Sequence, residues 1–451
     1  MNACRRASTS TGAWAYALCS CVCVVLFSGG VNLAAAQEAK TLTRLHDPVI
    51  VKTALLTGLP TRDTAGYRLY SVQQGHLSPI PFQFDERDGA SEIVFNDTDA
   101  KDEFRLDEND ELVFMVKDTG DRMVPGMLPA TSDAAVEIEV ADSLNEGRGW
   151  AYLIHFPTDA PPASPVTYAI FDSKTNQART SFYTMEYYPG RNFFTGMRIH
   201  PSAGGTGENF LDRMKVRVNP TFSLGVTTWS PLFTEEQMTV TIDGVKNGPV
   251  RSIRRVRQSL DLSRYIPAIP NGTTYTYFYA SSFVTPSRFA VPWLVLKLLR
   301  EFRFIGVSDF RNNAIGMQYW DPVNSRGLPF TGSNHTGVNS SQDHEWYVVG
   351  GRAGTHLQAF VIPEQWRQWG IVRGTVFQDD DLATDREGRE EEPGIHAAGY
   401  SLLNMTNLRE SGVYDLAMAV IVLPRPYQPG DELQPLAMLK EPLTATVRRI
   451  K

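Results

Sequence analysis

Cysteine is absent from most of this chain. The four cysteines, Cys4, Cys19, Cys21 and Cys23, all lie near the N-terminus, and none follows them. The chain beyond Cys23 therefore has no thiol for a disulfide, a thiolate-bound zinc ion, an iron–sulfur cluster or a cysteine nucleophile. Its function must rest on other side chains.

Long apolar runs are also scarce, and one of them lies close to the N-terminus. Arg5 and Arg6 precede an apolar stretch over Trp14–Phe27, and small residues then lead to Ala34-Ala35-Ala36. A positive start, an apolar core and an A-x-A site are typical of a secretory signal peptide. We therefore expect residues 1–36 to be a signal peptide, cleaved near Ala36. Because an exported protein without disulfides fits a bacterial envelope best, we expect a soluble periplasmic or secreted protein.

Positive charge is in short supply, with 43 Lys and Arg residues against 50 Asp and Glu residues and a net charge of −7. Loss of Arg5 and Arg6 with the signal peptide would make the chain more acidic still. An acidic protein binds poorly to nucleic-acid phosphates, so we expect no nucleic-acid partner. We also expect no membrane span, because the later apolar stretch Trp293–Phe304 is interrupted by Lys297 and Arg300.

Helical periodicity is rare, and strand patterns dominate instead. Apolar and acidic residues alternate over Val136–Val140, as in a half-buried strand, and Leu112–Val116 is a continuous apolar run. Further strands are expected at Trp150–Phe156, Val166–Phe171, Thr239–Ile242, Trp346–Gly350, Thr355–Ile362 and Ala417–Leu423. These patterns predict an all-β fold with few short helices.

A small number of segments predict turns and helices. Asp243-Gly244, Asn247-Gly248 and Asn271-Gly272 predict tight hairpin turns, since such pairs adopt positive φ angles readily. Pro363–Trp369 predicts a short helix, because proline suits a first helical turn. The pattern of Trp293–Phe304 fits a helix or a strand, and the surrounding strand signals favour a strand.

The proline-rich segment 157–165 marks a domain boundary, because it is stiff, polar and free of large apolar residues. We predict a signal peptide over 1–36, an N-terminal β-sandwich module over 37–157 and a linker over 158–165. A larger antiparallel β-sandwich or supersandwich domain is predicted over 166–451. The alternative is a surface loop inside one domain.

An acidic cluster follows the first predicted strands, with eight carboxylates in fifteen residues: Asp97, Asp99, Asp102, Glu103, Asp107, Glu108, Asp110 and Glu111. Calcium prefers about six to eight oxygen ligands, and Asp97, Asp99, Asp102 and Asp107 could supply them. The spacing does not follow an EF-hand, because Lys101 stands at a ligand position. The alternative is a loop whose charges face water. We predict no other cofactor.

A basic strand and an aromatic strand follow one another. Strand alternation places Arg251, Arg255 and Arg257 on one face of the first, and Tyr275, Tyr277 and Tyr279 on one face of the second. Guanidinium groups bind carboxylates or sulfates, and tyrosine rings stack on sugars. Together they predict a site for an acidic glycan. The alternatives are ion pairs with the protein's own carboxylates and a buried tyrosine row.

Three short stretches carry a family resemblance: Ile80–Glu86, Asn247–Arg251 and Ala417–Pro424 followed by Tyr427. They resemble exported bacterial β-proteins whose larger domain is a galactose-mutarotase-like supersandwich. Such families include polysaccharide lyases and many uncharacterised members. The resemblance implies a β-sandwich architecture and contact with carbohydrate, and no catalytic residue is carried over from it.

Three hypotheses about function remain open. The first is an exported protein that binds an acidic polysaccharide through the Arg/Tyr face. The second is a polysaccharide lyase or hydrolase, for which Arg255, Tyr277 and His200 have suitable side chains. The third is a structural or assembly component of the bacterial envelope. The sequence does not decide whether the protein is an enzyme.

Overall fold

The computed structural model describes residues 37–60, 64–95, 106–260, 272–333, 335–336, 342–383 and 392–451. The predicted signal peptide and its cleavage site at Ala36 lie outside the described residues, as do Asp97, Asp99 and Asp102. Residues Gln37–Lys451 form one unit. Within the described ranges, no helix is long and apolar enough to cross a membrane.

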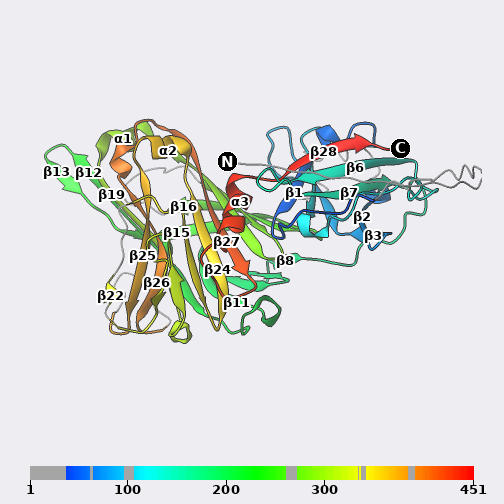
Figure 1. Cartoon of the computed structure of the whole chain (residues 1–451). Coiled ribbons are helices and arrows are strands. Elements are labelled where there is room, and N and C mark those ends of the chain that lie inside the picture. The colour runs from blue at the N-terminus through cyan, green and yellow to red at the C-terminus, as the bar shows by residue number, and fades with distance from the viewer. Residues whose placement is uncertain are drawn as a thin grey trace, which may run out of the picture. The chain divides into compact units, whose positions relative to one another are not determined.

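The all-β prediction is confirmed: the described residues form antiparallel sheets and three short α-helices. The helices are α1 (Trp293–Leu298), α2 (Glu364–Gln368) and α3 (Leu433–Lys440). The strands group into a smaller and a larger set, which we call the small sandwich and the large sandwich (Figure 1).

The small sandwich consists of two sheets that pack on one apolar core. One sheet has the order β1 (Pro48–Lys52), β5 (Glu111–Met115) and β4 (Phe82–Asp85). The other has the order β28 (Thr444–Arg449), β6 (Ala134–Ala141), β7 (Arg148–His155), β2 (Tyr67–Gln73) and β3 (His76–Ile80). Leu112 and Phe114 of the first sheet meet Ile138 and Leu153 of the second in the shared core.

The chain returns to the small sandwich at its last strand. β28, drawn in red, lies beside β6 and pairs with it from Thr444↔Ala141 to Arg449↔Val136 (Figure 1). The predicted boundaries place this strand in the large domain, and that division into domains stays a prediction. Sequence patterning indicates the strand but not its partner, because the pairing joins residues about 300 positions apart.

The large sandwich contains a nine-stranded sheet in the order β15 (Met238–Asn247), β16 (Ser252–Leu260), β17 (Gly272–Phe278), β18 (Ser282–Val291), β27 (Gly412–Leu423), β24 (Gly354–Val361), β23 (Trp346–Gly351), β20 (Gln318–Trp320) and β21 (Leu328–Pro329). A seven-stranded sheet has the order β13 (Thr227–Trp229), β12 (Leu211–Leu224), β19 (Leu299–Phe310), β26 (Ile395–Leu403), β25 (Val372–Asp380) and β22 (His335–Thr336), with β14 (Phe233–Thr234) paired to β12. A four-stranded sheet has the order β11 (Phe194–Ile199), β10 (Tyr183–Tyr187), β9 (Gln177–Thr180) and β8 (Ala169–Asp172).

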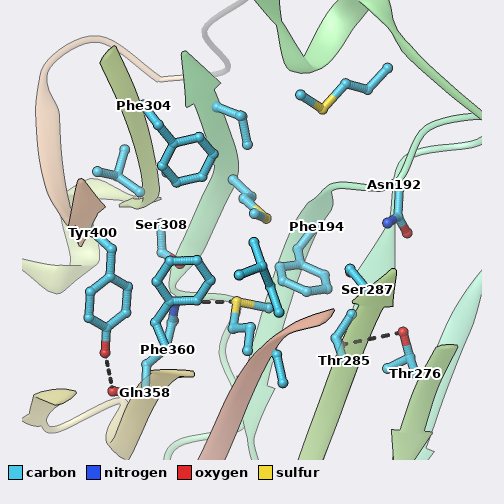
Figure 2. Close-up of a pocket in the computed structure, with 18 of the residues that line it drawn as sticks. Asn192, Phe194, Thr276, Thr285, Ser287, Phe304, Ser308, Gln358, Phe360 and Tyr400 are labelled. Atoms are coloured by element: carbon cyan, nitrogen blue, oxygen red, sulfur yellow. Dashed lines mark hydrogen bonds between the residues drawn. The ribbon is translucent and has the colours of Figure 1, made fainter. Parts of the chain in front are cut away.

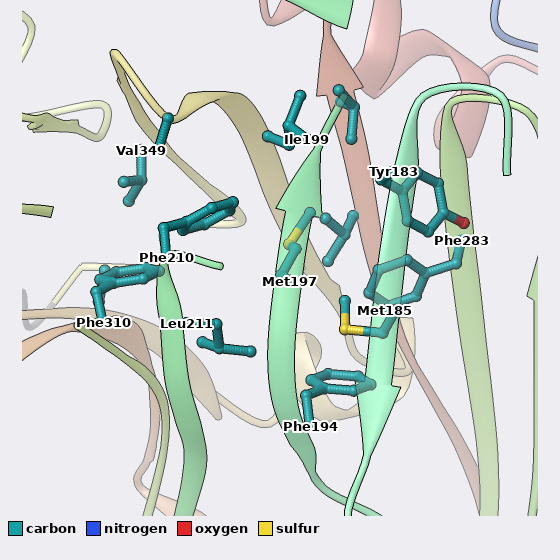
Figure 3. Packing of buried hydrophobic residues seen from close by; sticks show 14 of the residues in the cluster. Tyr183, Met185, Phe194, Met197, Ile199, Phe210, Leu211, Phe283, Phe310 and Val349 are labelled. Atoms are coloured by element: carbon teal, nitrogen blue, oxygen red, sulfur yellow. The ribbon is translucent and has the colours of Figure 1, made fainter. Parts of the chain in front are cut away.

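The three sheets of the large sandwich share one core. Tyr183, Phe194 and Phe283 lie together in it, and Phe210 lies beside Phe310 (Figure 3). Such aromatic contacts bury large apolar areas, which is why this sandwich can hold three sheets together without a disulfide.

Two local predictions need correction. Asp243-Gly244 forms no hairpin turn but lies inside β15, where the register shifts between Ile242 and Gly244. Glycine is needed there because a Cβ atom would lie 2.6 Å from the ring of Phe95. Trp293–Phe304 is not one strand: α1 occupies its first half and β19 begins at Leu299, where alternation of apolar and charged residues begins. The predicted helix at Pro363–Trp369 is confirmed as α2.

Candidate functional site

The predicted arginines and tyrosines do gather in space. β16 and β17 are neighbours, with Arg255 opposite Tyr275. The guanidinium of Arg251 lies 4.9 Å from the ring centre of Tyr277 and donates a 3.0 Å hydrogen bond to the hydroxyl of Tyr279. Strand alternation therefore predicts correctly which side chains share this face of the sheet.

The small sandwich covers the Arg251 end of this face. Arg251 is only 1% exposed, and it forms 2.8 Å contacts with the carboxylates of Asp85 on β4 and Glu111 on β5. The side chain of Gln83 accepts hydrogen bonds from the backbone N–H groups of Val250 and Arg251. Arg251 therefore forms ion pairs with the protein's own carboxylates, as the alternative prediction for this arginine states.

The other end of the face is also paired with the protein's own groups. Arg255 and Arg257 both contact the carboxylate of Asp243, at 3.0 and 2.6 Å. Tyr275 stacks on Phe95 and donates a hydrogen bond to Glu92. The side chain of Arg257 is 66% exposed. The three arginines therefore do not form an unpaired basic track, and ligand binding by them stays a prediction.

One groove, of about 400 Å³, remains open where the small sandwich meets this face. Its polar lining includes three of the predicted residues, Arg251, Tyr277 and Tyr279, together with Arg87 and Glu111. Its apolar lining comes from both sandwiches and from α3: Pro48, Ile50, Val284, Pro286, Met438, Leu439, Pro442 and Leu443.

Glu111 is the residue of this groove whose burial and ion pairing were not predicted from the sequence. It belongs to the acidic cluster, for which a calcium loop or a solvated loop was expected, but its side chain is buried. Arg87 donates to it at 2.9 Å and Lys52 at 2.8 Å, in addition to Arg251. Only its position at the start of the apolar run Leu112–Val116 hints that this carboxylate is buried.

Two carboxyl groups that line the groove have pKa values shifted in opposite directions. Burial alone would raise the pKa of Glu111, but Arg87, Arg251 and Lys52 outweigh burial and lower that pKa to about 2. Asp47 also lines the groove, and burial raises the pKa of its carboxyl despite the contact with Arg44. Burial likewise raises the pKa of Tyr277.

The calcium prediction remains a prediction. Of its four residues only Asp107 lies among the described residues, where its carboxylate accepts a hydrogen bond from the backbone of Asn109 at 3.0 Å. Among those residues, no group of three His, Asp or Glu side chains is arranged to hold a metal ion.

A second cavity, of about 240 Å³, lies between the nine-stranded and seven-stranded sheets of the large sandwich (Figure 2). None of the predicted site residues lines it. Phe304 and Ser308 of β19 face it from one sheet, and Thr276, Thr285 and Ser287 from the other.

Comparison with known protein families and with curated protein sequences finds no match. Two solved structures show a partial similarity to this chain. An alpha-mannosidase from Enterococcus faecalis V583 is 12% identical, with a TM-score of 0.43 over 91% of this chain and 45% of that one. A protein in the Glycosyl Hydrolase Family 38 from Enterococcus faecalis is 10% identical, with a TM-score of 0.42 over 91% of this chain and 46% of that one.

This chain thus spans less than half the length of either structure. With TM-scores below 0.5, these two similarities support no conclusion about this chain. The galactose-mutarotase-like architecture stays a prediction.

Proposed function

We propose that this chain is an exported, periplasmic or secreted protein that binds an acidic carbohydrate in the groove beside Tyr277. The observation that carries the proposal is the lining of the groove, where tyrosines and two arginines lie next to apolar side chains. A sugar ring has apolar faces and a polar rim, so it needs such a mixed surface.

Arg87 is the cation of this groove best suited to a carboxylate ligand. Arg251 is buried and bound by Asp85, Glu111 and Tyr279. Arg87 is less enclosed: its side chain is 17% exposed, and it contacts Glu111, the backbone oxygen of Ser91 and the side chain of Tyr277. A uronate at Arg87 would add a charge-assisted hydrogen bond without breaking the buried pair of Arg251 and Glu111.

A thermal-shift screen of residues 37–451 against polygalacturonate, alginate, hyaluronan and a neutral glucan tests this proposal, followed by calorimetric titration of any polymer that binds. We expect an acidic polymer to raise the melting temperature, because a ligand of the folded state stabilises it by mass action. Tyr277→Phe and Arg87→Gln should weaken binding by about tenfold, since each removes a polar contact.

Arg257→Gln is the matched control, because Arg257 lies on the same face outside the groove. It should bind like the wild type. If no polymer shifts the melting temperature, or if the groove variants bind like the wild type, the proposal is wrong.

A hydrolase is the second candidate, and the pair of Asp47 and Glu111 favours it. Glycoside hydrolysis uses one protonated and one ionised carboxyl group, and the opposite pKa shifts of these two residues fit that division. The lyase set is less well supported, since His200 lies at the end of β11 and contacts Thr184. New reducing ends from any polymer that binds, lost in Glu111→Gln, would establish the hydrolase.

A further inference from the structure

Arg254 is a buried cation whose charge no carboxylate balances among the described residues. It is 1% exposed and lies on β16, between Ile253 and Arg255. Its Nη1 donates a 2.9 Å hydrogen bond to the side chain of Asn192, and its Nε has no hydrogen-bond partner. The guanidinium lies over the ring of Tyr187, 4.3 Å from its centre.

Other buried arginines of this protein are paired. Arg44 contacts Asp47 and Asp142, Arg251 contacts Asp85 and Glu111, and Arg373 contacts Asp343 at 2.7 Å. A buried charge is strongly unfavourable unless an opposite charge compensates it, and burial accordingly lowers the pKa of Arg254. The pairing of the others makes the isolation of Arg254 a specific feature.

Arg254 does not itself line the cavity shown in Figure 2, but it contacts two residues that do. Its contacts Asn192 and Tyr187 both line that cavity, as does Thr276, its partner across the sheet. In Figure 2, Asn192 lies on the opposite side of the cavity from Tyr400. The positive charge is therefore adjacent to the side of the cavity that Asn192 lines.

The rest of the cavity is mainly apolar. Six of its lining residues are phenylalanine or methionine side chains drawn from several strands: Phe194, Met214, Met238, Phe304, Phe360 and Met418. The polar side chains that line it on the nine-stranded sheet already have partners within that sheet. Thr285 donates to Thr276 at 3.5 Å, and Gln258 and Ser287 both bond Thr274. Methionine adapts its shape to irregular apolar ligands.

The cavity has access to solvent and enough room for a ligand. Met214, Met238 and Phe304 are half-buried, so its lining is not sealed inside the core. An apolar cavity of about 150 Å³ already admits benzene. A cavity of about 240 Å³ can accept a longer, flexible alkyl chain.

We infer that this cavity binds a single-chain alkyl carboxylate, with the alkyl chain among the Phe and Met side chains and the carboxylate directed to Arg254. The carboxylate would supply the negative charge that Arg254 lacks and would accept a charge-assisted hydrogen bond. Arg254 and Gln258 project to the opposite face of β16 from Arg255, so this site is independent of the proposed carbohydrate groove.

Calorimetric titration with three ten-carbon ligands tests the inference: decanoate, decanol and decyltrimethylammonium. We expect wild-type protein to bind decanoate at least about tenfold more tightly than decanol, and not to bind the cation. In Arg254→Gln the preference for decanoate over decanol should disappear, while Arg255→Gln should keep it. Thr285→Phe, which fills the cavity from β18, should weaken both decanoate and decanol.

Stability gives a second readout that does not depend on a ligand. Arg254→Gln should raise the melting temperature of the free protein, because it removes an uncompensated buried charge. Decanoate should raise the melting temperature of the wild type and not that of Arg254→Gln. The inference is overturned if decanoate and decanol bind the wild type equally, if Arg254→Gln keeps the preference, or if none of the three ligands binds.

Discussion

Arg251 and Arg254 come from the same short stretch of sequence but have opposite environments. Arg251 faces the small sandwich and is bound by Asp85 and Glu111, whereas Arg254 faces the interior of the large sandwich and contacts Asn192 and Tyr187. Alternation predicts that they point to opposite sides of the sheet. It does not predict what covers each side of the sheet. Because the coverings differ, Arg251 forms structural ion pairs, whereas Arg254 is a candidate for binding a ligand.

His356 is a side chain with a clear pH effect. It is 2% exposed, its ring packs against Phe210 and Phe310, and burial lowers its pKa from 6.5 to about 4. The folded protein keeps this ring neutral, while the unfolded chain takes up a proton below about pH 6.5. Stability from His356 is therefore present above pH 6.5 and is lost as the pH falls toward 4, by roughly 3 kcal/mol.

Urea unfolding of wild type and His356→Leu at pH 7.5, 5.5 and 4.5 measures this effect. The free energy of unfolding should fall more steeply with pH in the wild type, and the difference between the two curves isolates His356 from the other titrating groups. Parallel curves would show that His356 is not held neutral.

Among the strands, β28 pairs with β6, which lies far from it in the sequence. Val447 lies opposite Ile138 of β6 and packs on the core of the small sandwich. Val447→Asp should lower the free energy of unfolding by about 1–3 kcal/mol, because it places an unpaired charge against that core. Hydrogen exchange of the β6 amides should speed up at the same time.

Thr444→Asp is the control for this change, since Thr444 is exposed on the same strand opposite Ala141. It introduces the same residue without entering the core and should change stability far less. Equal effects of the two substitutions would mean that β28 does not contribute to the core of the small sandwich.

The strand predictions succeeded where a pattern is complete within a few residues. Leu112–Val116 corresponds to β5, Trp346–Gly350 to β23 and Ala417–Leu423 to the end of β27. The hairpin prediction at Asp243-Gly244 was wrong because an Asp-Gly pair also occurs where glycine makes room for a ring distant in the sequence, here that of Phe95. Such a glycine can be recognised only when the distant residue is known.

For the molecule as a whole, the ion cluster around Arg251 connects the two sandwiches. Asp85 and Glu111 belong to the small sandwich and Arg251 to the large one, and all three are buried. Val113 and Met115 of β5 also share an apolar cluster with Val250 and Tyr279. The two sandwiches are thus joined by both charged and apolar contacts.

Arg251→Met tests this connection, because it leaves Asp85 and Glu111 buried without their shared cation. We expect the free energy of unfolding to fall by about 3–5 kcal/mol, measured by urea denaturation. Arg257→Met removes an exposed arginine from the same face and should cost less than about 1 kcal/mol. A similar small loss for both variants would contradict a joining role for Arg251.

Local chemistry accounts for the properties that the sequence by itself determines. The absence of thiols beyond Cys23, the strand alternation, the short helix α2 and the shared face of the arginines and tyrosines depend on residue type or on neighbours a few positions away. Long-range packing accounts for the rest. The hydrogen bond from Val250 to Gln83 spans 167 positions, and contacts of this kind bury Arg251, cover the tyrosine row and leave Arg254 beside a cavity. Residues so far apart meet only when whole sheets pack, so no local pattern carries this information.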